Sequence, residues 1–142
     1  MDKEHIFFEN YARNWDRDRK ADAKILSSFM ELAGIRPGSV ILDAGCGTGV
    51  LLPYLSAAAG DDGTVEGFDY SQQMIDVAKE KFSYLANVTF TTGDVLKYHF
   101  PEKHYDVVCC LNFYPHIASH SRDVIRRLYE AMVPGGTLLI MH

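Results

Sequence analysis

A glycine-rich segment at residues 43–49 combines a carboxylate with three glycines directly behind a short apolar run. It reads Asp43-Ala44-Gly45-Cys46-Gly47-Thr48-Gly49. Glycines let the backbone turn sharply and come close to a ligand. The aspartate that opens the segment would repel a pyrophosphate and attract a cation. A tight turn without a ligand is the alternative interpretation, and the carboxylates that follow later in the chain favour a ligand site.

Two common nucleotide loops fit this segment poorly. A dinucleotide loop has glycine at its first, third and sixth positions, the sixth sometimes alanine. Counted from Gly45, the sixth position is Val50 and the fifth is Gly49. A phosphate-binding loop of the nucleotidase kind needs Gly-Lys-Ser or Gly-Lys-Thr, which the segment does not contain. A nicotinamide-dependent oxidoreductase is therefore disfavoured.

Further acidic residues lie where the next two apolar runs end. Asp69 closes the run 64–68, and a carboxylate there can accept both hydroxyl hydrogens of a ribose. It could instead stabilise the start of the helix that Ser71 is expected to cap. Asp94 follows the next run and could accept a hydrogen bond from an adenine amino group, with the Val95 N–H donating to the ring. Taken alone, a Gly-Asp pair is more often a turn.

Apolar residues alternate between helical and strand spacing along the chain, which predicts a parallel sheet with right-handed helical crossovers in one α/β domain. Pro134-Gly135-Gly136 is expected to stop the last helix. The expected helices are 21–33, 50–59, one that begins after Ser71 and buries Met74, Ile75, Ala78 and Phe82, and 121–133 with Val124, Ile125, Leu128 and Met132 inward. The expected strands are 40–42, 64–68, 87–92, 105–111 and 137–141.

Composition narrows the class of protein. The 142 residues suffice for one domain, with 47% apolar and 23% charged residues. A formal charge of −5 disfavours a nucleic-acid partner. No apolar run reaches the length of a membrane span, and the polar start of the chain lacks a signal peptide, so a cytoplasmic protein is expected. The three cysteines, Cys46, Cys109 and Cys110, are expected to be buried and reduced.

The segment Leu42–Gly49 resembles the first motif of class I S-adenosylmethionine (SAM)-dependent methyltransferases. The resemblance covers roughly residues 35–142 and is strongest to the small-molecule group of ubiquinone and menaquinone biosynthesis (methyltransferase type 11). It implies a Rossmann-like α/β fold, a parallel sheet of five strands in the order 3-2-1-4-5 flanked by helices, with residues 1–34 as an N-terminal helical lid. The later matching motifs are Asp69, Gly93-Asp94-Val95, Tyr105-Asp106-Val107-Val108 and Pro134-Gly135-Gly136-Thr137-Leu138.

The same resemblance implies SAM as cofactor, S-adenosylhomocysteine (SAH) as product, and a small-molecule methyl acceptor. The glycine loop would wrap the amino-acid part of SAM, with Asp43 near its ammonium group. Asp69 would bind the ribose, and residues of the next helix and strand would surround the adenine. The implied cofactor-binding residues are Tyr11, Trp15, Asp43, Gly45, Cys46, Gly47, Gly49, Asp69, Tyr70, Met74, Asp94, Val95, Leu111 and Asn112.

Methyl transfer from a sulfonium needs mainly positioning and the exclusion of water, because the cofactor is already activated. A base near neutral pKa would help if the acceptor is a hydroxyl or a weakly acidic carbon. His116, with Tyr114 beside it, is the candidate base, although His116 could simply begin a loop. His116 and His120 could share a metal on one helical face. No carboxylate lies near them at matching spacing, so no metal is expected.

The end of the chain departs from the family pattern. Relatives continue past the fifth strand with a helix and an antiparallel hairpin, whereas this sequence stops at His142. The C-terminal hairpin is therefore expected to be absent, and the last apolar strand is expected to have an open edge. Self-association that covers this strand is one expectation. A domain that binds SAM or SAH without turnover is the alternative to an active methyltransferase.

Overall fold

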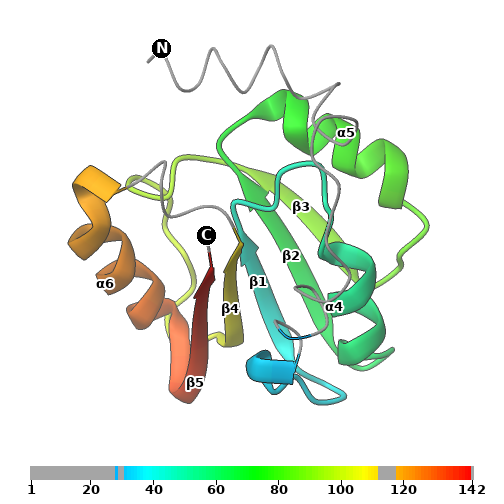
Figure 1. Ribbon diagram of the computed structural model, residues 1–142, viewed down its shortest axis with the longest axis horizontal. Helices are drawn as coiled ribbons and strands as arrows, with labels where there is room; N and C mark the ends of the chain where they lie inside the picture. The colour runs from blue at the N-terminus through cyan, green and yellow to red at the C-terminus, as the bar shows by residue number, and fades with distance from the viewer. Residues whose placement is uncertain (1–27, 29–30, 112–117, 142) are drawn as a thin grey trace.

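Five parallel strands form one sheet within the part of the chain that the computed structural model describes, residues 28, 31–111 and 118–141. Their order is β3-β2-β1-β4-β5, which confirms the expected 3-2-1-4-5 order. Figure 1 shows the strands side by side with β5 at one edge and β3 at the other. Across these residues, no helix has both the length and the apolarity to cross a membrane. The strands are β1 (Val40–Ala44), β2 (Thr64–Asp69), β3 (Val88–Thr92), β4 (Tyr105–Leu111) and β5 (Met132–Met141).

One face of the sheet packs against α4 (Leu52–Ala59) and α5 (Gln72–Phe82). Alternate residues of a strand point to opposite faces, so Ile41 and Val65 reach this side. The helix α4 buries Leu52, Leu55 and Ala59 at helical spacing. Because β1 is covered on both faces, its sequence is apolar except for Asp43, as in other parallel sheets.

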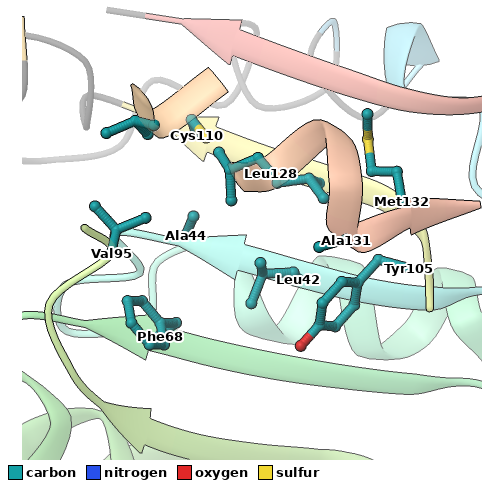
Figure 2. Close-up of a cluster of buried hydrophobic side chains, with 11 residues drawn as sticks. Leu42, Ala44, Phe68, Val95, Tyr105, Cys110, Leu128, Ala131 and Met132 are labelled. Carbon is teal, nitrogen blue, oxygen red and sulfur yellow. The ribbon is translucent and has the colours of Figure 1, made fainter. Parts of the chain in front are cut away.

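The opposite face packs against α6 (Ser121–Ala131) and the segment 95–100. Figure 2 shows Leu128 and Ala131 of α6 above Leu42 and Tyr105 of the strands. Aromatic rings continue this core toward β3: the Phe68 ring centroid lies 5.1 Å from that of Tyr98 and 5.0 Å from that of Phe100. The sheet that carries the candidate site is therefore packed between two separate hydrophobic cores, one on each face.

The start of α5 confirms the expected cap. The Ser71 side chain accepts a hydrogen bond from the Met74 N–H at 3.2 Å, with Ser71 itself in an extended conformation. Such a cap satisfies one of the donors left open in the first helical turn. The cap fixes where β2 ends and α5 begins. This point lies at the carboxyl ends of the strands, where the candidate site is.

The end of the chain corrects the sequence-based assignment. α6 ends at Ala131, and Met132 already belongs to β5, so the helix does not reach residue 133 and the strand does not wait for Thr137. Pro134-Gly135-Gly136 lies inside β5, at a bulge: Tyr105 of β4 pairs with Met132, but Val107 pairs with Thr137. Ile125, expected to face inward, is 39% exposed.

Other boundaries differ by a few residues. β1 extends to Ala44, α4 begins at Leu52 rather than at Val50, and β3 begins at Val88. Of the expected helix 21–33, residues 28 and 31–33 are described and are helical. Gly34 follows with φ +61°, as expected of a glycine C-terminal cap.

β5 pairs with β4 alone among the described strands. Ile140 on β5 is 36% exposed. The expected self-association through this edge stays a prediction.

Candidate functional site

The glycine loop follows β1 at the carboxyl end of the sheet. Gly45, Gly47 and Gly49 have φ values of +75°, +57° and +93°. Residues with a Cβ atom rarely adopt this left-handed region, so the alternation of glycines with other residues is what lets the loop fold. The loop runs from the end of β1 to α4 (Figure 1).

Backbone donors of this loop are already bonded within the protein. The Gly45 and Cys46 N–H groups donate to the Phe68 carbonyl at 2.7 and 2.9 Å. The Gly47 N–H donates to Asp69 Oδ2 at 2.8 Å, and the Gly49 N–H to the Cys46 carbonyl at 3.0 Å. A pyrophosphate site needs backbone N–H groups that point at the ligand. This loop therefore fits a cationic group better than a phosphate.

Two glycines allow close packing around the loop. A Cβ atom on Gly49 would lie 2.9 Å from two ring carbons of Phe82 on α5. A Cβ atom on Gly67 of β2 would lie 3.2 Å from Cys46 Sγ. The sequence predicted Phe82 on the buried face of α5 but gave no sign of its contact with the glycine loop, and Gly67 was not singled out. An isolated glycine inside an apolar strand was the available signal, because it marks a close approach of another chain segment.

Asp69 connects the tip of β2 to both neighbouring segments. Its Oδ2 accepts from the Gly47 N–H at 2.8 Å, and its Oδ1 accepts from the Ser71 N–H at 2.9 Å. The Asp69 carbonyl accepts from the Gly93 N–H at 2.9 Å, which brings the end of β3 alongside. Both interpretations of Asp69 thus remain compatible: the residue orders the start of α5, and its carboxylate stands beside the glycine loop.

Asp43 is buried in the central strand directly below the loop. Only 1% of its surface is exposed, and its Oδ2 has no hydrogen-bond partner among the described residues. Burial, assisted by the nearby charge of Asp69, raises the pKa of Asp43 from 3.8 to about 7. An unpaired buried carboxyl oxygen is costly, so it marks a position where a ligand donor would be strongly held.

Asp94 and Val95 lie at the end of β3, beside the same edge. Asp94 Oδ1 accepts from the Leu96 N–H at 2.9 Å, and the Asp94 carbonyl accepts from Tyr98 at 2.8 Å, so a tight turn begins here. The Val95 side chain is 5% exposed. No acceptor for the Val95 N–H lies within residues 31–111 or 118–141. The turn that was the alternative interpretation is therefore present, and the contacts of Asp94 and Val95 with an adenine stay a prediction.

The remaining expected site residues divide into two groups. Tyr70 is half-buried between Asp69 and Ser71, and Met74 on α5 is 1% exposed, so its side chain is enclosed by packing. Leu111 ends β4. Tyr11, Trp15, Asn112, Tyr114 and His116 lie outside the described residues.

The cysteines are buried and free, as expected. Burial raises the pKa of Cys46, and the charges of Asp69 and Asp43 raise it further. Burial also raises the pKa values of Cys109 and Cys110, so the described thiols are neutral and unreactive. Within the described residues, no three His, Cys, Asp or Glu side chains come together as a metal site would require.

Comparison with known families gives one matching domain. Residues 41–136 match the sequence profile of a family described as "Methyltransferase domain". The match starts in β1, includes the glycine loop, Asp69 and Asp94, and ends in the bulge of β5.

Individual relatives agree with this match. The chain is 33% identical to the ubiquinone/menaquinone biosynthesis C-methyltransferase UbiE of Ectopseudomonas mendocina, over 79% of this chain and 44% of the relative. It is 29% identical to the demethylmenaquinone methyltransferase of Staphylococcus aureus, over 96% of this chain and 58% of the relative. A solved SAM-dependent methyltransferase from Aquifex aeolicus superposes with a TM-score of 0.66 at 30% identity, covering 78% of this chain and 57% of that one. The chain thus spans about half the length of the curated relatives that it matches.

Proposed function

Because the chain belongs to the methyltransferase domain family, whose cofactor is SAM, we propose that it binds SAM in the crevice at the tips of β1, β2 and β3 for methyl transfer to a small molecule. The relatives are named for quinone biosynthesis, and a small acceptor of that kind is the substrate class that this similarity favours.

One observation supports the cofactor assignment above the others. The glycine loop uses the N–H groups of Gly45, Cys46, Gly47 and Gly49 internally, while Asp43 below it keeps an unpaired buried oxygen. Such a site offers acidic side chains and few free N–H donors. The ammonium group of an amino-acid tail is a donor with positive charge, whereas the pyrophosphate of a nicotinamide dinucleotide is an acceptor with negative charge. The residues present therefore fit SAM.

Residues around the crevice take complementary roles in this proposal. Asp69 accepts hydrogen bonds from the ribose hydroxyls, and Tyr70 flanks the adenine. The Val95 N–H and the Asp94 carboxylate read the adenine edge as donor and acceptor. Gly49, packed against Phe82, holds the loop close enough for its backbone to wrap the amino-acid part.

The bound cofactor supplies an activated methyl group, so the chain needs mainly to position the acceptor and exclude water. A base near neutral pKa assists where the acceptor carries a hydroxyl or a weakly acidic carbon. His116 and Tyr114 follow β4 along the chain and are the candidates for this role, with Leu111 and Asn112 beside the methionine part.

Calorimetric titrations with SAH and with a nicotinamide dinucleotide test the cofactor assignment. We expect SAH to bind with a defined stoichiometry and the dinucleotide not to bind. The reverse preference would refute the proposal. Transfer of labelled methyl groups from SAM to an extracted metabolite pool then tests turnover, because a domain that only binds the cofactor would label nothing.

A further inference from the structure

Asp43 occupies an unusual place for an acidic residue. It lies on the central strand β1, paired with Gly67 of β2 on one side and Cys109 of β4 on the other. With 1% of its surface exposed, it has almost no contact with water. Ionising a carboxyl group in such a place costs far more than at the surface unless a cation or several donors compensate.

The groups that face Asp43 do not compensate its charge. Among the described residues, the ionisable groups that interact with it are Asp69 at the end of β2, Cys46 in the glycine loop, and Cys109 and Cys110 on β4, which are acidic or neutral. No described basic side chain pairs with Asp43, and its Oδ2 has no donor within the described residues. The pKa of about 7 follows from this setting, with burial as the larger cause and Asp69 as the smaller one.

Asp69 has the opposite surroundings, although it belongs to the same crevice. Backbone N–H groups of Gly47 and Ser71 donate to its two oxygens at 2.8 and 2.9 Å, and they stabilise its negative charge. When two carboxyl groups share a site, the proton goes to the one with fewer donors. Here that group is Asp43.

We propose that the ligand-free protein keeps a proton on Asp43 and that the ammonium group of the bound amino-acid tail replaces this proton. The inference rests on the proposed function, because it needs a ligand with an ammonium group at the glycine loop. On binding, the O–H bond of the Asp43 carboxyl group breaks, its proton passes to the solvent, and the carboxylate pairs with the ammonium group. No electrons are transferred in this exchange.

Proton exchange makes the affinity depend on pH in a defined direction. Below about pH 7 the ligand must displace the proton, so the dissociation constant rises as the pH falls. With the Asp43 pKa at about 7, the affinity for SAH drops roughly 25-fold between about pH 7.5 and about pH 5.5. A ligand without the amino-acid tail shows no such loss from Asp43.

Calorimetry at about pH 6 measures the exchange directly. SAH is titrated in two buffers of different ionisation enthalpy, and the difference in observed heat gives the number of protons released. We expect about 0.9 proton per bound SAH, the fraction of Asp43 that is protonated at this pH. 5′-Methylthioadenosine, which has the nucleoside and the thioether but no amino-acid tail, should release close to none.

The variant Asp43→Asn provides the second comparison, because it keeps the size of the side chain and removes the titration. SAH binding to it should release close to no protons at the same pH. The methylthioadenosine comparison uses the unaltered protein and therefore stands even if the variant does not fold. SAH binding to the unaltered protein without proton release would overturn the exchange and leave the cofactor assignment intact. A failure of SAH to bind at any pH would overturn both.

Discussion

The carboxylate of Asp69 accepts a hydrogen bond from the Gly47 N–H at 2.8 Å and thereby ties the tip of β2 to the glycine loop after β1. Its second oxygen accepts from the Ser71 N–H at 2.9 Å, where α5 begins. One side chain thus holds together a loop, a strand and a helix that a nucleoside ligand would contact. The relative positions of the glycine loop, β2 and α5 therefore depend on the same carboxylate that is proposed to bind the ribose.

Replacing Asp69 with alanine should weaken SAH binding by more than about 1 kcal/mol. The variant loses the acceptors for the ribose and releases the Gly47 N–H. Calorimetric titration measures the loss, and circular dichroism reports whether the fold is kept. Asp61→Ala, in the exposed loop before β2, is the matched control and should bind as the parent does. Unchanged affinity in a folded Asp69→Ala protein would reject the ribose assignment.

Replacing Asp43 with asparagine should stabilise the ligand-free protein, and more so at higher pH. In the unfolded chain Asp43 ionises near pH 3.8, but in the folded protein only near about 7. Between these values the folded state binds more protons than the unfolded state, so the free energy of unfolding falls as the pH rises, and above about 7 the full loss is present. The substitution removes this loss.

Denaturant titrations at about pH 5 and about pH 8 test this expectation. The stability gained by Asp43→Asn should be about 2–3 kcal/mol larger at the higher pH. Asp61→Asn makes the same exchange on the surface and should show no such increase. A gain that is equal at both pH values would contradict a proton on the buried carboxyl group.

Gly49→Ala should destabilise the protein through two separate effects. A Cβ atom at φ +93° is strained, and it would also lie 2.9 Å from the Phe82 ring. Gly38→Ala is the matched control, because Gly38 has φ +89° but nothing within 4 Å of the added atom. In denaturant titrations, the free energy of unfolding of Gly49→Ala should be at least about 1 kcal/mol lower than that of Gly38→Ala. Equal losses would show that the contact with α5 does not constrain the loop.

Tyr105→Phe should cost about 1–3 kcal/mol of folding stability without affecting the crevice. The Tyr105 hydroxyl donates to Glu66, whose other oxygen accepts from Thr91 Oγ1 at 2.8 Å. Burial, with this hydrogen bond as a second cause, raises the pKa of Tyr105, so the hydroxyl stays a donor. Thermal denaturation measures the loss. In the same measurement, Tyr129→Phe on α6, at a side chain that is 72% exposed, should leave the stability unchanged. A neutral Tyr105→Phe variant would mean that water replaces the lost donor.

Local signals in the sequence were sufficient for most of the fold. The alternation of apolar runs with helical spacing located the five strands, and the family resemblance gave their order. Ser71 was identified as a helix cap because a serine before an amphipathic segment has one common use. The glycine loop was placed after β1 because three glycines there allow the left-handed conformations that the turn requires.

The start of β5 was predicted wrongly for a physical reason. Pro134-Gly135-Gly136 normally ends regular structure, since proline lacks an N–H and glycine adds flexibility. β5 has β4 as its only described neighbour, so a residue that cannot donate is tolerated at a bulge on this edge strand. The bulge takes up the extra residues between the pairs Tyr105–Met132 and Val107–Thr137. Such a pairing depends on two distant segments and has no local signal.

Two features of the site likewise could not be predicted from the sequence. The burial of Asp43 without a donor depends on its neighbours in the sheet, which are Gly67 of β2 and Cys109 of β4. The N–H groups of Gly45, Cys46 and Gly47 are occupied because they donate to the Phe68 carbonyl and the Asp69 carboxylate. These acceptors lie more than twenty residues away along the chain. Motif spacing identified which residues meet, whereas only the folded structure shows which of their atoms remain available to a ligand.

A crystal structure of the protein with SAH would show where the amino-acid tail and the ribose of the cofactor bind. We expect the amino group of the ligand within hydrogen-bond distance of an Asp43 carboxyl oxygen, and the two ribose hydroxyls on Asp69. A nucleoside bound elsewhere, or a glycine loop whose N–H groups turn outward to hold an anion, would contradict it.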